Sequence, residues 1–211
     1  MKNRLSPLPL ALFALVSLPL ISGRSQTLIT FDDLSQTSTG LVSTNIPNGY
    51  EGLTTWSNMF VVNAVRDTAA NGTNGYYYGM MSASNVAYNG FGLPAEIDSP
   101  GSNFDFLSAY FTGAWNSNLN IEVQGFGTGG LLYDTTVVVS ATSPTLFTFN
   151  YLDIDRLYFD SYGGEVAFGP SPEYNFVMDN MTIDFIPEPS SLLLTGFGAF
   201  SLWAFLKRKR A

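Results

Sequence analysis

The sequence predicts an all-β fold, an antiparallel β-sandwich of jelly-roll type, between two apolar terminal segments. Short strand-like runs recur through the middle of the chain, and Gly, Asn, Ser and Pro separate them. No helical periodicity is sustained over residues 26–185. The ~160 residues of this middle region are a suitable size for a single sandwich domain.

Nine runs carry the strand prediction, and several of them alternate apolar and polar residues. Leu119, Ile121 and Val123 share one face of their run, and Phe147 and Phe149 alternate with threonines. The predicted strands are Thr27–Phe31, Met59–Val65, Asn85–Tyr88, Phe104–Thr112, Leu119–Phe126, Leu131–Ser140, Thr145–Asn150, Leu157–Asp160 and Phe176–Phe185.

The N-terminus has the pattern of a secretion signal peptide, which we assign to residues 1–25. Lys2 and Arg4 make its start positive, and the apolar stretch Leu8–Ile21 follows. The small residue Ser25 is suited to the position before the cleaved bond. An uncleaved anchor is the alternative, but prolines interrupt the short apolar stretch.

The C-terminal segment, residues 186–211, has the pattern of a membrane anchor. Residues 190–206 carry no charge and would span roughly 25 Å as a helix, which is near the lower limit for a bilayer core. Four cations follow, and by the positive-inside rule they orient the segment with this end in the cytoplasm. These membrane-orienting residues are Lys207, Arg208, Lys209 and Arg210.

The tripeptide Pro187, Glu188, Pro189 precedes the anchor, and the prolines keep it extended and open to a protease. Tripeptide, apolar helix and basic end together resemble the PEP-CTERM sorting tail. The resemblance implies that an exosortase, a membrane-embedded protease, processes this exported protein. It implies first an inner-membrane protein with its ectodomain in the periplasm, and after processing a protein of the cell surface or extracellular matrix. A simple tail anchor is the alternative.

Composition excludes several kinds of chemistry. The chain has no Cys and no His, so disulfides, Cys/His zinc sites and Ser-His-Asp or Cys-His catalysis are excluded. All 17 acidic residues lie between Asp32 and Glu188, a stretch in which only Arg66 and Arg156 are basic. Such an acidic domain repels phosphate backbones, so nucleic acid is not an expected partner.

A metal site in this chain would be built from oxygen ligands, which favours Ca²⁺. Asp32 and Asp33 end the first predicted strand, and Asp179 lies in the last. The first and last strands often lie together in jelly-roll binding modules, so resemblance makes these three the candidate ligands of a structural Ca²⁺. The alternative is that they cap turns or face water. Asp153, Asp155 and Asp160 fit a solvated strand face better.

Aromatic residues offer a second candidate site, a platform on which sugars stack. Tyr76, Tyr77 and Tyr78 lie in a Gly/Asn-rich stretch, and on a strand at least one of them should face outward. Trp56, Tyr88 and Trp115 could join them, although packing in the core is the alternative for each.

The sequence therefore predicts a non-enzymatic envelope or matrix protein that associates with exopolysaccharide. From Phe104 onward the chain also resembles secreted β-sandwich proteins that carry the same tail, which implies a fold rather than an activity. A carbohydrate-binding module, with or without Ca²⁺, is the alternative. A glycoside hydrolase is a more remote one, for which Glu122 and Glu165 are candidates by residue type alone.

Overall fold

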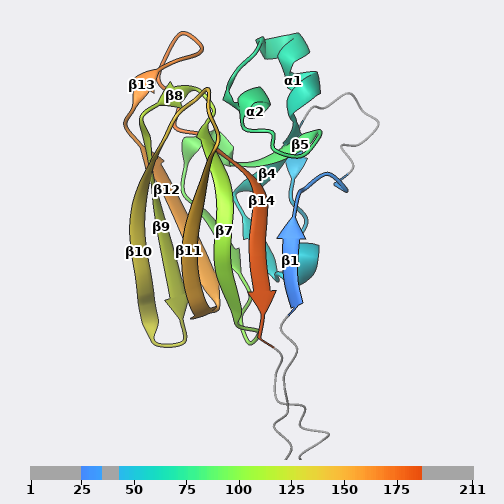
Figure 1. Cartoon of the computed structure of the whole chain (residues 1–211), viewed down its shortest axis with the longest axis vertical. Coiled ribbons are helices and arrows are strands. Elements are labelled where there is room, and N and C mark those ends of the chain that lie inside the picture. Colours follow the sequence, from blue (N-terminus) through green and yellow to red (C-terminus); the bar gives the residue numbers. More distant parts are fainter. Residues whose placement is uncertain (1–24, 35–42, 187–211) are drawn as a thin grey trace, which may run out of the picture.

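Two antiparallel sheets face each other in the computed structural model, which describes residues 25–34 and 43–186 (Figure 1). The predicted leader, apart from Ser25, and the predicted tail from Pro187 onward lie outside the described residues. The predicted antiparallel β-sandwich is confirmed.

The first sheet has seven strands within the described ranges. Its strand order is β11-β7-β14-β5-β4-β2, and β1 pairs with β14. The strands are β1 (Ser25–Ile29), β2 (Ser43–Asn45), β4 (Met59–Asn63), β5 (Asn85–Asn89), β7 (Phe104–Gly113), β11 (Thr145–Ile154) and β14 (Phe176–Phe185).

The second sheet has five strands in the described part of the chain, in the order β10-β9-β12-β6-β3. They are β3 (Thr55–Ser57), β6 (Ala95–Asp98), β9 (Leu119–Gly127), β10 (Gly130–Val139) and β12 (Arg156–Tyr162). A small ladder pairs β8 (Asn116–Ser117) with β13 (Glu165–Val166).

The helices α1 (Ala64–Asn71) and α2 (Gly75–Tyr78) lie at the end of the sandwich opposite the last residue of β14 (Figure 1). Two 3-10 turns, η1 (Tyr50–Gly52) and η2 (Gly90–Gly92), lie in the loops. At the other end, Ser25 of β1 pairs with Phe185 of β14, so both ends of the described domain lie side by side.

All nine predicted strands are present, and β14 has the predicted bounds. The predicted strand Met59–Val65 is two residues too long, because the side chain of Asn63 caps α1 and starts a helix there. The short strands β2, β3, β6, β8 and β13 and both helices were not predicted.

The core between the sheets is dominated by phenylalanine. Phe104, Phe106 and Phe111 of β7 are fully buried, as are Phe159 of β12 and Phe176 of β14. The Phe111 ring centre lies 5.7 Å from that of Phe176 and 6.2 Å from that of Phe159, so it bridges strands of both sheets. Edge and tilted contacts of this kind add to the free energy gained by burial.

In the described ranges, no helix has the length and apolar character needed to cross a bilayer. The predicted anchor, residues 190–206, lies outside those ranges.

Removing the Phe111 ring should destabilise the domain severely, because the cavity would open between the sheets. We expect Phe111→Ala to lower the free energy of unfolding in urea by about 3–5 kcal/mol. Leu146→Ala, on exposed β11, is the control and should cost less than about 1 kcal/mol. Equal losses would contradict the assignment of the core.

Candidate functional site

A row of side chains on the outer face of the seven-stranded sheet forms the floor of the candidate site. Phe60 of β4 lies opposite Tyr88 of β5, and Val62 lies opposite Val86. Met59 and Val61 alternate with them and point into the core, so Phe60 and Val62 point outward. The rings of Phe60 and Tyr88 are 5.6 Å apart.

The α1–α2 segment adds a third ring above this floor. Asn74 caps α2 by accepting the backbone N–H of Tyr76 at 3.0 Å. The buried Tyr76 ring then makes T-shaped contacts with Tyr88, 5.2 Å away, and Trp115, 5.8 Å away. Asp67 holds the two helices together, because its carboxylate oxygens accept the side-chain amides of Asn71 and Asn74, each at 2.7 Å.

These elements enclose a pocket of about 300 Å³, which we call the aromatic pocket. Aromatic rings form much of its wall, and amides and two carboxylates supply polar groups. Its lining residues are Ser43, Phe60, Val62, Asp67, Asn71, Tyr76, Tyr88, Gly90, Phe91, Trp115, Glu173 and Asn175.

Phe91 stands at the pocket with its ring in solvent. It is 86% exposed, and its φ of 58° lies in the left-handed region that a bulky residue rarely adopts. Asn58 fixes the turn by donating to the carbonyls of Gly90, Leu93 and Pro94 at 2.9–3.2 Å. An exposed aromatic on a strained, well-braced turn points to a functional role.

Buried side-chain amides also stabilise the turn that carries Phe91. Asn89 donates to the Leu93 carbonyl at 2.9 Å and to the Ser161 hydroxyl at 3.0 Å, and it accepts the backbone N–H of Phe176 at 2.8 Å. Asn175 donates to the Asn89 carbonyl at 2.6 Å. Because these buried polar groups are hydrogen-bonded, the pocket wall is preorganised.

The pocket is electrostatically negative. Burial is the main cause that raises the pKa of Tyr76, and the nearby charges of Asp67 and Glu173 raise it further. Burial also raises the pKa of Tyr88, whose hydroxyl lies 2.7 Å from that of Ser43. Both phenols therefore stay protonated near pH 7.

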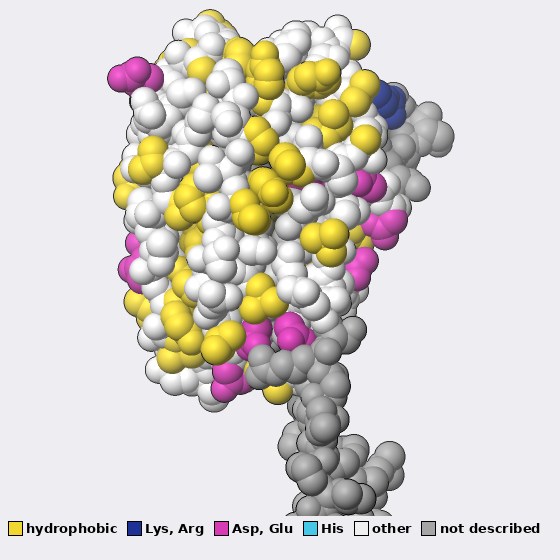
Figure 2. Space-filling view, in the orientation of Figure 1, with side chains coloured by type: hydrophobic (Ala, Val, Ile, Leu, Met, Phe, Trp, Pro, Cys, Tyr) yellow, Lys and Arg dark blue, Asp and Glu magenta, His cyan; other side chains and the backbone are white. Residues whose placement is uncertain are grey.

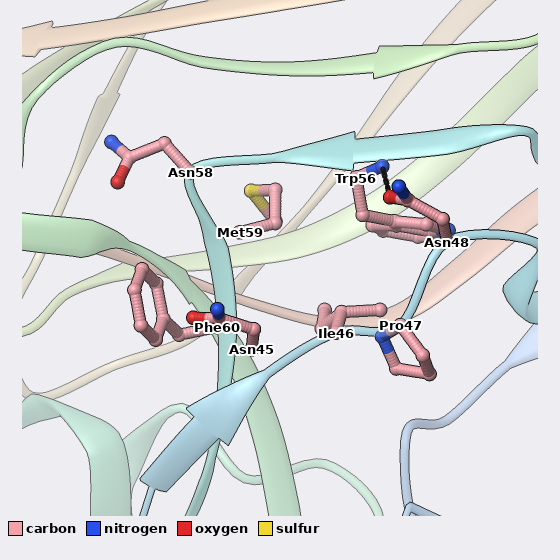
Figure 3. Close-up of a pocket in the computed structure, with 8 residues that line it drawn as sticks. All are labelled: Asn45, Ile46, Pro47, Asn48, Trp56, Asn58, Met59 and Phe60. Carbon is pink, nitrogen blue, oxygen red and sulfur yellow. Dashed lines mark hydrogen bonds between the residues drawn. The ribbon is translucent and has the colours of Figure 1, made fainter.

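A second pocket, of about 510 Å³, lies where the edge strands β2 and β3 of the two sheets come together (Figure 3). We call it the edge pocket. Phe60 and Asn58 lie at one end of it and Pro47, Asn48 and Trp56 at the other (Figure 3). Asn45, Ile46 and Met59 complete the lining.

The structure brings together part of the predicted aromatic platform. Tyr76, Tyr88 and Trp115 share one pocket, and at least one of Tyr76–Tyr78 faces outward as predicted, although the three lie in the helical turn α2 and not on a strand. Asn74 caps a helical turn there, so Tyr76 is 6% exposed while Tyr77 and Tyr78 are 41% and 38% exposed outside the pocket. Trp56 is buried beside Phe31 and lines the edge pocket instead.

The predicted Ca²⁺ ligands are engaged in hydrogen bonds. Asp179 is buried and accepts the backbone N–H groups of Met81 and Ser82 at 2.7 and 2.9 Å. Asp32 accepts the backbone N–H of Asn85 at 2.9 Å, and Asp33 accepts the Tyr50 hydroxyl at 2.6 Å.

As predicted, the first and last strands pair. In the ranges that the structure describes, no three acidic side chains group in a way that could hold a metal ion. Binding of Ca²⁺ by Asp32, Asp33 and Asp179 stays a prediction, which a thermal melt with and without chelator tests.

The sequence reasoning missed Phe60, Phe91 and Glu173. Phe60 lies in the apolar run Met59–Val62, and nothing in that run indicates which of its side chains face outward. Phe91 had a usable signal, because an aromatic residue between two glycines of a turn has little opportunity to be buried. Glu122 and Glu165, the hydrolase candidates, lie on β9 and β13 and line neither pocket.

Comparison with known proteins gives distant structural similarities only. No protein-family model matches the chain, and no curated protein matches it. TmCBM61 in complex with β-1,4-galactotriose is 12% identical, with a TM-score of 0.31 over 65% of this chain and 93% of that one.

An adhesin domain of Lys-gingipain from Porphyromonas gingivalis W83 is 12% identical, with a TM-score of 0.37 over 78% of this chain and 99% of that one. A structure described as CBM4 is 14% identical, with a TM-score of 0.26 over 44% of this chain and 71% of that one. These similarities are too distant to assign the chain to any of the three groups.

Asp179 should make stability depend on pH. Burial raises the pKa of Asp179 to about 6, even though backbone N–H groups lower it. An acid whose pKa is raised by folding stabilises the folded state while protonated, and that contribution is lost as the pH rises through the folded pKa. Between about pH 4 and pH 7 we expect a loss of roughly 3 kcal/mol in the free energy of unfolding.

Urea titrations of the wild type and of Asp179→Asn across this pH range measure the effect. The variant cannot ionise, so its stability should fall less steeply. Asp134→Asn, at an exposed position, is the matched control and should keep the wild-type slope. Parallel curves for all three proteins would show that Asp179 does not titrate in this range.

Proposed function

We propose that the β-sandwich is a non-catalytic glycan-binding domain, of jelly-roll type, that holds a neutral polysaccharide in the aromatic pocket. The observation that carries the proposal is the convergence of Phe60, Tyr76, Tyr88 and Trp115 on one pocket, with exposed Phe91 beside them. No other function has a comparable site among the described residues.

The chemistry of the lining matches a sugar. A pyranose ring presents apolar C–H faces, which pack on aromatic rings, and hydroxyl groups, which need hydrogen-bond partners. The pocket offers both, since Asn71, Asn175 and Glu173 lie beside the rings. Rigid aromatics with a small number of placed polar groups are typical of small-molecule sites.

Charge narrows the ligand to neutral or cationic glycans. Asp67 and Glu173 line the pocket, and neither of the two basic residues in the described ranges, Arg66 and Arg156, does so. Acidic side chains also gather at the base of the visible face and add to the negative charge of the whole domain (Figure 2). A uronic-acid or sulfated polymer would be repelled by the carboxylates of Asp67 and Glu173 in the pocket.

The state of Asp67 supports binding rather than catalysis. Glycoside hydrolysis commonly needs two carboxyl groups free to act on the substrate. Both carboxylate oxygens of Asp67 instead accept amide hydrogens, from Asn71 and Asn74. In this arrangement Asp67 fixes the pocket wall, and Glu173 is left without a second free carboxyl group in the lining.

Phe91→Ala provides the cleanest test, because the exposed ring contributes little to folding. We expect an unchanged melting temperature and about tenfold weaker binding to the best ligand on an array of neutral glycans, as expected from losing 1–2 kcal/mol of apolar contact. Trp115→Ala should also weaken binding. Tyr162→Ala, at an exposed position on β12, is the matched control and should bind like the wild type.

Absence of binding to every neutral glycan on the array would contradict the proposal. So would binding that survives both Phe91→Ala and Trp115→Ala.

We further propose that the domain reaches the cell surface by export and exosortase processing. The tail that begins at Pro187 supports this proposal. The tail also follows the last strand of the domain directly, as a sorting signal should. Ile186 directly follows β14, whose last residue, Phe185, pairs with Ser25, the predicted last residue of the leader. The first and last strands of the described domain therefore end side by side, at Ser25 and Phe185.

Expression with and without a functional exosortase tests the sorting proposal. The mass of the mature protein should fall only when the enzyme is active, by a cut near Pro187, Glu188 and Pro189. Replacing Pro187 and Pro189 by Ala should block the cut, whereas replacing Ser191 by Ala should not. An unchanged mass and location in both strains would contradict sorting and leave the glycan-binding proposal intact.

A further inference from the structure

Phe60 belongs to both pockets. Its ring lines the aromatic pocket together with Tyr88 and Phe91, and it also closes one end of the edge pocket (Figure 3). The ring centres of Phe60 and Phe91 are 6.2 Å apart in a T-shaped contact. The two pockets are therefore neighbours that share a wall.

Strand pairing makes the path from one pocket to the other continuous. Asn45 of β2 lies directly opposite Phe60 of β4, which in turn lies opposite Tyr88 of β5. Residues opposite one another in adjacent strands present their side chains on the same face. From Asn45 the lining continues around the edge of the sheet to Asn48 and Trp56.

The edge pocket repeats the chemistry of the aromatic pocket. It combines Phe60 and Trp56 with three asparagines, and it has no charged lining residue. Asn48 is fixed at the wall by accepting the backbone N–H of Trp56 at 3.1 Å. Asn58 braces the Phe91 turn and lines the edge pocket, so one residue ties the two sites together.

Resting on the proposed function, we infer that the ligand is the interior of a linear, uncharged polysaccharide that occupies both pockets and crosses Phe60. The aromatic pocket alone, at about 300 Å³, is at the lower limit for a ligand site. The edge pocket adds about 510 Å³. The edge pocket is an open hollow rather than an enclosed cavity, so a polysaccharide chain can continue past it and a chain end is not required.

Titration calorimetry with oligosaccharides of increasing length tests the inference. The probes are disaccharides, tetrasaccharides and hexasaccharides of neutral β-1,4-glucan, β-1,4-mannan, β-1,4-galactan and α-1,4-glucan. For the preferred series we expect the hexasaccharide to bind about tenfold more tightly than the disaccharide. Reduction of the terminal sugar should leave hexasaccharide affinity unchanged.

Asn45→Trp is the decisive variant, because the larger side chain would fill the edge pocket next to Phe60. It should lower hexasaccharide affinity to the level of the disaccharide and leave disaccharide affinity unchanged. Thr136→Trp, at an exposed position on β10, is the matched control and should keep the length dependence. Thermal melts of both variants verify that the fold is retained.

The outcomes separate the inference from the proposed function. Equal affinity for all lengths, or a length dependence that survives Asn45→Trp, would overturn the inference and leave glycan binding in the aromatic pocket. Loss of hexasaccharide binding on terminal reduction would also overturn it, in favour of chain-end recognition. Absence of binding to all probes would contradict the proposed function itself.

Discussion

The register between β4 and β5 is the constraint on which both the core and the candidate site depend. It places Phe60 opposite Tyr88 on the outer face while Met59, Val61 and Ala87 point into the core. A slip by one residue would exchange the two faces, burying the rings of the site and exposing the core. Correct pairing of β4 with β5 therefore forms the core and the candidate site together.

Side-chain amides connect the loops of this domain, a role that ion pairs and disulfides often have in other proteins. Asn58, Asn85, Asn89 and Asn175 each bond to backbone groups of segments distant in sequence. An amide donates and accepts at once, so a single buried asparagine can join several loops. In a chain without cysteine, this network is what gives the irregular loops around the aromatic pocket one defined arrangement.

The long strands could be predicted from sequence because alternation over many residues leaves few alternatives, as in Leu119–Gly127, where buried and half-buried residues alternate. Strands of two to four residues, such as β2 and β3, are too short to show an alternation of apolar and polar residues. They form because they pair with strands that are distant in sequence. The same limit applies to the site. Tyr76, Tyr88 and Trp115 could be named as candidates by residue type, but only strand pairing shows that Phe60 joins them.

The aromatic pocket and the paired ends of β1 and β14 lie far apart on the domain. Ser25 and Phe185 pair at one end, whereas the aromatic pocket lies beside the opposite end of β14, where Tyr88 pairs with Val177. From Val177 to Phe185 the strand rises roughly 26 Å. The length of the sandwich therefore keeps the paired ends of β1 and β14 away from the aromatic pocket and leaves the approach to the pocket clear of them.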